Sequence, residues 1–154
     1  MPLKVQLLAD RPSVVPAATE PTTRMQSEGR AHEDAMHRRF ADEFGPLYVP
    51  APWLRYRNFS DWRYCQPDGL LFRTDGRVII CEAKLQHTPT AISQTERYKR
   101  VVSALLPRWN VCVLEVVRFY KGAGVDGFDI PVRVVIRPDG ARGDIFNVLI
   151  LPRW

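Results

Sequence analysis

Residues 67–84 read Pro-Asp-Gly-Leu-Leu-Phe-Arg-Thr-Asp-Gly-Arg-Val-Ile-Ile-Cys-Glu-Ala-Lys. Two mostly apolar runs, residues 70–73 and 78–81, flank Thr74-Asp75-Gly76, and a glycine at that place accepts the positive φ that a hairpin turn requires. The pattern predicts an antiparallel hairpin. Its second strand is apolar on both faces, which is typical of a strand that is covered on both sides of a sheet.

The covered strand ends in charged residues. Glu82 and Lys84 follow the apolar run, with Ala83 between them. Because side chains alternate along a strand, Glu82 and Lys84 project from one face and Ala83 from the other. The sequence therefore predicts that a carboxylate and an ammonium emerge together where the buried strand ends.

The length of the hairpin loop decides whether Asp68 joins these two residues. A two-residue loop would place Asp68 opposite Ala83, whereas a three-residue loop places it opposite Glu82, with Gly76 in the left-handed conformation. We predict the three-residue loop, which brings two carboxylates side by side near Lys84. Adjacent carboxylates repel unless a cation lies between them, and hard oxygen ligands suit Mg²⁺ or Mn²⁺.

The composition is that of one globular domain. The chain has 154 residues, of which 45% are hydrophobic and 25% charged, so it can bury a substantial core. We expect residues 25–154 to form this domain and residues 1–24, which contain four prolines, to form an extended arm with at most a short strand near residues 5–8. The 22 basic and 17 acidic residues give a net charge of +5, which favours an anionic partner such as nucleic acid.

The spacing of cysteine and histidine indicates no structural zinc or iron–sulfur cluster, and we expect no small-molecule cofactor. Cys65, Cys81 and Cys112 are odd in number and lack C-x-x-C spacing, and the three histidines add no zinc pattern. No apolar run approaches membrane-spanning length and no signal peptide is recognisable. We expect a reduced, soluble, cytoplasmic protein that does not interact with a membrane.

Residues 25–44 have the apolar periodicity of a helix, with Thr23 or Ser27 as its N-cap and Gly45-Pro46 as its stop. The apolar stripe consists of Met36, Phe40 and Phe44.

Steps of three and four residues extend this stripe back to Glu33 and Gly29. Glu33 would then face inward, where an unpaired carboxylate is costly, and Gly29 would let this end of the helix approach another backbone closely. In the alternative interpretation, Glu33 lies at the fraying edge of the stripe and is solvated.

The remaining pattern predicts an edge strand centred on residues 53–57, a helix over residues 91–106, and strands over residues 111–117, 131–136 and 146–151. Residues 121–129 contain three glycines and are expected to form a mobile loop. In the second helix, Gln94 and Tyr98 share one face, and positive charge comes from Arg97, Lys99 and Arg100. That helix is alternatively an ordinary amphipathic surface helix with the core residues Ile92, Val101, Val102 and Leu105.

The order helix, three strands, helix, strand carries Gly-x-x-x-Glu at residues 29–33, Pro-Asp at 67–68 and Glu-x-Lys at 82–84. This arrangement resembles the PD-(D/E)XK nuclease superfamily, and Gln94-Thr-Glu-Arg-Tyr98 is similar to the Gln-x-x-x-Tyr motif of its RecB-like exonuclease branch. The resemblance covers about residues 25–117. It implies an α/β fold with a central mixed β-sheet flanked by helices, an αβββαβ core, to which the extra C-terminal strands are added.

The resemblance implies a Mg²⁺- or Mn²⁺-dependent deoxyribonuclease. Asp68, Glu82 and the carbonyl of Ala83 would bind the ion. Glu33 would complete the ligands or hold a second ion, and Lys84 would orient the attacking water. The DNA backbone or a strand end would be contacted by Gln94 and Tyr98, with the neighbouring cations Arg97, Lys99 and Arg100.

The chain also departs from the family pattern. His32 lies three residues after Gly29, whereas RecB-like enzymes usually have Gly-x-x-x-His, so Glu33 rather than His32 is expected as the ligand. A free-standing domain of this size is similar to a phage-type or accessory exonuclease, a junction resolvase or a small restriction-like endonuclease. The last two classes often act as homodimers, so a homodimer is also possible.

Two other classes of function compete with a nuclease. One is a catalytically inactive nucleic-acid-binding or protein-interaction module on the same fold. In the other, Asp68, Glu82 and Lys84 form a structural ion network while the basic helix binds a protein or an RNA. Thermal stabilisation by Mg²⁺ would separate a metal site from an ion network, which needs no metal.

Overall fold

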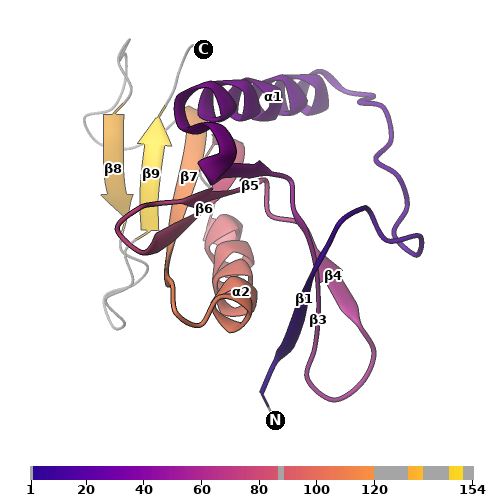
Figure 1. Ribbon diagram of the computed structural model, residues 1–154. Coiled ribbons are helices and arrows are strands. Elements are labelled where there is room, and N and C mark those ends of the chain that lie inside the picture. Colours follow the sequence, from indigo (N-terminus) through magenta and orange to yellow (C-terminus); the bar gives the residue numbers. More distant parts are fainter. Residues whose placement is uncertain (1, 87–88, 120–131, 137–145, 151–154) are drawn as a thin grey trace.

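The computed structural model describes residues 2–86, 89–119, 132–136 and 146–150 (Figure 1). Its elements are, in chain order, β1 (Lys4–Leu8), α1 (Arg24–Phe44), the 3₁₀-helix η1 (Gly45–Leu47), β2 (Tyr48–Pro50), β3 (Trp53–Arg57), β4 (Arg63–Cys65), β5 (Gly69–Phe72), β6 (Arg77–Gln86), α2 (Pro89–Leu105), β7 (Asn110–Phe119), β8 (Val132–Ile136) and β9 (Phe146–Ile150). The expected loop at residues 121–129 lies outside the described residues.

The central sheet is mixed and has the strand order β2-β5-β6-β7-β9-β8. Strand β5 is antiparallel to β2 and β6, β7 is parallel to β6 and β9, and β8 is antiparallel to β9. The predicted α/β class is therefore confirmed. The elements α1, β2, β5, β6, α2 and β7 follow the αβββαβ order, and β8 and β9 are the two extra C-terminal strands.

The β5–β6 hairpin has the predicted loop and alignment. The Arg73 N–H donates to the carbonyl of Arg77 across Thr74-Asp75-Gly76 (2.8 Å), and Gly76 has a φ of 85°. Gly69 pairs with Cys81, so the next residue outward on each side brings Asp68 opposite Glu82. The glycine thus fixes which side chains share a face, because only glycine adopts this φ without strain.

The two helices cover opposite faces of the central sheet, as Figure 1 shows with α1 and α2 on different sides of it. On the α1 side, Met36 and Phe40 pack with Tyr48, Leu71, Cys81 and Val116. On the α2 side, Val101 and Val102 pack with Val78, Ile80, Val111 and Val113. Strand β6 contributes to both clusters, which explains why its sequence is apolar on both faces.

The sequence predicts an edge strand centred on residues 53–57, and this prediction is wrong. The edge position belongs to Tyr48–Pro50, while β3 is the central strand of a second, three-stranded sheet in the order β1-β3-β4. The chain changes direction between the two sheets at Ala51, which has a φ of 44°. The alternation of β3 was genuine, but its apolar face, Leu54 and Tyr56, packs against α2. Periodicity gives the face of a strand, not the sheet to which it belongs.

Helix α1 begins and ends where its sequence indicates. The Thr23 side chain accepts from the Gln26 N–H (3.1 Å) and the Gln26 side chain accepts from the Thr23 N–H (3.3 Å), which together form a capping box. Gly45, with a φ of 55°, follows its last residue. The expected close approach at Gly29 is contradicted, because a Cβ placed on Gly29 would meet nothing within 4 Å.

Candidate functional site

Two hydrogen bonds hold Asp68 against Glu82 and the residue that follows it. The Asp68 N–H donates to Oε1 of Glu82 (3.1 Å), and the Ala83 N–H donates to Oδ2 of Asp68 (2.7 Å). Glu82 is only 1% exposed. The hairpin thus holds two carboxylates side by side, one residue beyond the last β5–β6 pair, in the arrangement that the three-residue loop predicts.

These surroundings disfavour the charged form of both acids. Burial, followed by the negative charge of Glu33, raises the pKa of Asp68 to about 6. Burial, followed by the charge of Asp68, raises the pKa of Glu82 to about 8. Lys84 acts in the opposite direction on both pKa values but does not cancel these effects. Full ionisation of the pair therefore calls for more positive charge than Lys84 supplies.

Lys84 is oriented by helix α2. Its Nζ donates to Oε1 of Gln94 (3.0 Å), and Nε2 of Gln94 donates to the hydroxyl of Tyr98 (3.0 Å). The Tyr98 hydroxyl in turn donates to the carbonyl of Gln66 (3.3 Å), two residues before Asp68. One chain of hydrogen bonds thus connects the lysine of β6, one face of α2 and the segment that presents Asp68.

This chain places the residues of α2 that the sequence singled out. Tyr98 is 5% exposed, so its ring belongs to the core and its hydroxyl to the lysine-holding network. Gln94 is half-buried, Arg97 and Arg100 are exposed, and Lys99 is partly exposed. Gln94 and Tyr98 therefore position Lys84 in this structure, and the most exposed cations of this group are Arg97 and Arg100.

The backbone at Asp68 is also held from the bend between the two sheets. The Ala51 N–H donates to the carbonyl of Asp68 (2.8 Å), and the side-chain amide of Gln66 donates to the carbonyl of Ala51 (2.9 Å). Ala51 makes these bonds at a φ of 44°, a conformation that costs a non-glycine residue on the order of 1 kcal/mol. The two hydrogen bonds of Ala51 offset this strain, and they hold the Pro67-Asp68 segment at both ends.

Gly69 is required where it stands because the ring of Tyr48 occupies the place of its side chain. A Cβ on Gly69 would lie 2.6 Å from Cε2 of Tyr48, far inside van der Waals contact. The Tyr48 hydroxyl is hydrogen-bonded to Nδ1 of His37 on α1 (2.7 Å). The tyrosine therefore connects the first helix to the residue that directly follows Asp68.

Glu33 lies at the rim of the site and has a partner of its own. Its Oε1 is 3.4 Å from Nε2 of His37, one helical turn later, and its side chain is 40% exposed. The hydrogen bond with His37 lowers the pKa of Glu33. Glu33 is thus neither turned fully inward nor simply solvated. Its charge acts on Asp68, which agrees with the predicted approach of the first helix to the hairpin.

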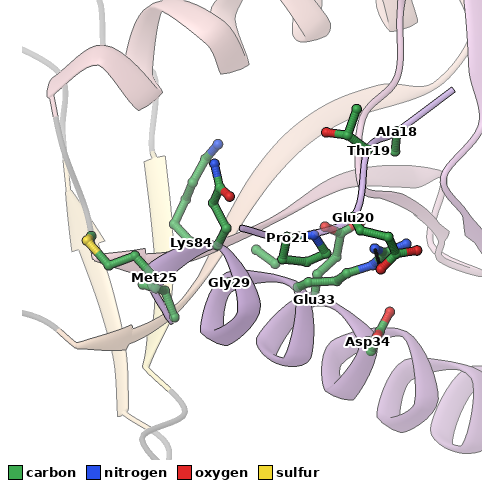
Figure 2. A pocket seen from close by; sticks show the side chains of 13 residues that line it. Ala18, Thr19, Glu20, Pro21, Met25, Gly29, Glu33, Asp34 and Lys84 are labelled. Carbon is green, nitrogen blue, oxygen red and sulfur yellow. Dashed lines mark ion pairs between the residues drawn. The ribbon is translucent and has the colours of Figure 1, made fainter. Parts of the chain in front are cut away.

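A pocket of about 890 Å³ opens beside this rim. Figure 2 shows it between the arm residues 18–21, the first turns of α1 and the end of β6, with Glu33 and Lys84 among its lining side chains. Arg30 also lines it, 3.7 Å from Glu20 of the arm. Asp68 and Glu82 do not contribute to the described lining, so the pocket reaches the lysine and the rim acid but stops short of the buried pair.

Sequence reasoning missed two residues of this region. Glu115, which is 0% exposed, pairs with Glu82 in the parallel β6–β7 alignment, so a third acid lies on the same face of the sheet. In the sequence, Glu115 is recognisable as a single charged residue within the apolar run of residues 111–117. His37 was missed because its partners, Glu33 and Tyr48, are recognisable only in three dimensions. His32, which the sequence left doubtful, is buried with Nε2 3.0 Å from the carbonyl of Val116 and so faces β7.

No family model, curated protein or solved structure matches this chain. Within the described ranges, no helix combines the length and the apolar character that crossing a membrane requires. The same part of the chain contains no group of three His, Cys, Asp or Glu side chains placed to hold a metal ion. The chemistry is therefore inferred from Asp68, Glu82, Lys84 and Glu33 themselves.

Proposed function

We propose that this protein is a metal-dependent nuclease that hydrolyses phosphodiester bonds in DNA, with Asp68 and Glu82 as ligands of Mg²⁺ or Mn²⁺. The observation that carries the proposal is the buried pair itself. Two carboxylates are held together by backbone hydrogen bonds, their pKa values are raised, and a lysine on the same strand is positioned by a separate network.

The donor set suits a hard divalent cation. Each carboxylate spends one oxygen on a backbone N–H, and a carboxylate offers a second oxygen to an ion. A cation between the two acids would relieve the repulsion that raises their pKa values. Mg²⁺ needs few protein ligands because water and substrate phosphate fill its other positions. The carbonyl of Ala83 would be a third donor, with Glu33 close enough to act electrostatically on Asp68.

The chain's own residues supply the rest of the chemistry. A bound divalent ion lowers the pKa of water and offsets the charge that develops on the phosphate. Gln94 holds the Lys84 ammonium, whose fixed positive charge stabilises hydroxide character in a nearby water and negative charge on a phosphate oxygen. Tyr98 and Ala51 fix the backbone on either side of Asp68, which reduces the reorganisation needed to reach the reactive geometry.

The positive net charge of the protein and its resemblance to a nuclease superfamily support DNA as the substrate. The net charge of +5 favours a polyanion, and Arg97 and Arg100 are exposed on the helix that positions Lys84. The resemblance to the PD-(D/E)XK superfamily supports the same roles for Glu33, Asp68 and Glu82. Hydrolysis from an end and cutting at a junction are both compatible with this site.

A binding module on the same fold is the second candidate, and one observation favours it. Glu82 is almost fully covered, and the described pocket does not reach it. In that case Asp68 and Glu82 share protons in a structural pair, and Mg²⁺ leaves the melting temperature unchanged. A metal site instead gives a melting temperature that rises with Mg²⁺ concentration, because the ion binds the folded state selectively.

The deciding experiment is a cleavage assay. Labelled linear duplex, covalently closed circle, single strand and four-way junction are each incubated with the protein in Mg²⁺, in Mn²⁺ and in chelator. We expect cleavage of at least one substrate with either metal and none with chelator. Cutting of the circle identifies an endonuclease, whereas cutting confined to the linear forms identifies an exonuclease. Binding without cleavage of all four substrates would support the second candidate.

A further inference from the structure

The three-stranded sheet has one face against α2 and one face turned outward. Leu54, Tyr56 and Cys65 are buried on the α2 side. Because side chains alternate, the strand alignment places the intervening residues on the other side, where Lys4 pairs with Arg57 and Tyr64 with Arg55. We call this outer surface the arginine–tryptophan face; it consists of Lys4, Trp53, Arg55, Arg57, Trp62 and Tyr64. Each of these six side chains is partly or fully exposed.

Trp62 organises this face. The guanidinium carbons of Arg55 and Arg57 lie 4.5 Å and 4.6 Å from the centre of its ring. Arg55 is held further by a hydrogen bond from its Nε to the amide oxygen of Gln6 on β1 (2.6 Å). In the loop between β3 and β4, Phe59 is 78% exposed. Rings and cations are thus arranged in advance on a rigid sheet.

The cations of this face have not been neutralised by neighbouring acids. Within the described residues, neither Arg55 nor Arg57 forms a salt bridge, in contrast to Arg24, Arg30 and Arg77. Two guanidiniums share one indole instead. Such a surface suits a polyanion that also has flat apolar groups, because cation–π stacking leaves the outer N–H donors of both arginines available.

We propose that the arginine–tryptophan face binds a single strand of nucleic acid, with bases stacked on its rings and phosphates at its arginines and Lys4. Platforms for single strands combine these two features, and each stacked base contributes about 1–3 kcal/mol. A duplex fits less well because its bases already stack on one another. Trp, Tyr and Arg are also enriched at protein–protein interfaces, so a protein partner is the alternative outcome that the test must separate.

The face is joined directly to the candidate site. Strand β4 ends at Cys65, and only Gln66 and Pro67 separate it from Asp68. Gln66 is bonded both to Tyr98 and to Ala51. The strand β4, which carries part of the outer face, is therefore only two residues along the chain from the segment that carries the first acid. This inference deepens the proposed function by naming DNA with a single-stranded segment as the substrate, and it rests on that function only for cleavage.

The test measures binding without cleavage. The full chain is titrated, in chelator, into fluorescent oligothymidine of about 15 nucleotides, a length that one such platform can cover, and into a duplex of equal length. We expect Trp62→Ala to weaken single-strand binding about tenfold or more, since loss of one stacked base has that effect, and to change duplex binding much less. Trp62→Phe keeps a ring and should retain most of the affinity.

Charge is tested separately with a matched control. The double variant Arg55→Gln/Arg57→Gln should weaken single-strand binding about tenfold and flatten its dependence on salt concentration, because each phosphate contact adds to the slope. Arg38→Gln/Arg108→Gln removes the same two charges from exposed positions on α1 and between α2 and β7 and should change the affinity less than about twofold. Melting curves of all four variants establish that each is folded.

Two outcomes would overturn the inference. If folded Trp62→Ala and Arg55→Gln/Arg57→Gln bind the single strand as the unaltered protein does, the face does not contact nucleic acid. If these variants instead abolish a dimer seen by sedimentation while strand binding stays unchanged, the face is a protein interface. Neither outcome concerns cleavage. Conversely, loss of cleavage in Glu82→Ala with normal strand binding leaves this inference intact, so the two proposals fail independently.

Discussion

The site contains two pairs of side chains in which the carboxyl pKa values are shifted in opposite directions. Asp68 and Glu82 are covered and lie beside each other, and their pKa values are raised. Glu33 is half-exposed and hydrogen-bonded to His37, and its pKa is lowered. Positively charged side chains of the protein favour the ionised form of Glu33. They do not offset the effects that disfavour ionisation of Asp68 and Glu82. This difference indicates where an external cation has most to contribute, namely at the buried acids.

The sharpest test of this difference compares removal of one acid from each place. Glu82→Ala should reduce the cleavage rate at least about a thousandfold, because it removes charge stabilisation worth roughly 4 kcal/mol. Glu33→Gln should reduce the rate only about tenfold, because its carboxylate already has a partner. DNA binding should persist in Glu82→Ala and can become tighter, since an acid that repels phosphate is gone. Equal losses in both variants, measured by single-turnover cleavage, would erase the distinction between the two pairs.

Lys84 stands beside the buried pair without being a ligand, and it should be separable from the metal. Lys84→Ala should reduce cleavage about a hundredfold or more, a typical loss for a group that assists the nucleophile, while the stabilisation by Mg²⁺ remains. Gln94→Ala removes the acceptor that orients the ammonium and should have the same effect in weaker form. Calorimetric titration with Mg²⁺ provides the control. Loss of metal binding in Lys84→Ala would mean that the lysine supports the acids rather than the reaction.

The exposed cations of α2 should affect binding more than chemistry. Arg97→Ala/Arg100→Ala should weaken DNA binding several-fold, to a similar extent for unrelated sequences, and should reduce the slope of affinity against salt concentration. The single-turnover rate at saturating protein should change little, because neither side chain is part of the Lys84 network. Fluorescence anisotropy at several salt concentrations measures both the affinity and the slope. A slope equal to that of the unaltered protein would remove α2 from the binding surface.

The smallest predicted effect is the dependence of folding stability on pH. Because folding raises the pKa values of Asp68 and Glu82, the folded state binds more protons than the unfolded state above pH 4.5, so stability falls as pH rises towards 8. In chelator, the melting temperature should drop by a few degrees between pH 5.5 and pH 8. Mg²⁺ should raise the melting temperature more at pH 8 than at pH 5.5, because the ion binds the ionised acids.

Two variants localise this pH effect. Glu82→Gln should reduce the dependence of melting temperature on pH, because it removes one of the two groups that titrate in this range, the one with the higher pKa. Glu33→Gln should change the slope less, because Glu33 is itself ionised throughout this range and its removal acts only by lowering the pKa of Asp68, which its charge raises. A slope that is unchanged in Glu82→Gln would place the titrating groups elsewhere.

Local patterns were sufficient to predict the hairpin and both helices. Gly76 selects a three-residue loop, and that loop alone sets Asp68 opposite Glu82. Thr23 and Gly45 mark the ends of α1 because capping is decided by a few neighbouring residues. These features depend on interactions between residues close in sequence, which is why they can be inferred without knowledge of the tertiary structure.

Features that depend on distant partners could not be inferred. Strand β3 reads as an edge strand, but its central place depends on β1 and β4, which pair with it on either side. The hydrogen bond from the Tyr98 hydroxyl to the carbonyl of Gln66, 32 positions away, has no signal in the sequence. His37 gains its role from Glu33 on its own helix and from Tyr48 beyond it. Each case joins segments whose sequences give no sign of their meeting.

The fit of the Tyr48 ring over Gly69 has a consequence for how the hairpin tolerates changes in length. The turn around Gly76 aligns β5 with β6 from one end, and the tyrosine aligns it with β2 from the other. A residue inserted into the turn would shift β5 along β6 only if the Tyr48 ring also moved away from Gly69. The insertion should therefore be absorbed as an outward bulge, and the spacing of the two acids is buffered against it. A larger side chain at position 69 removes that protection, even though it touches neither acid.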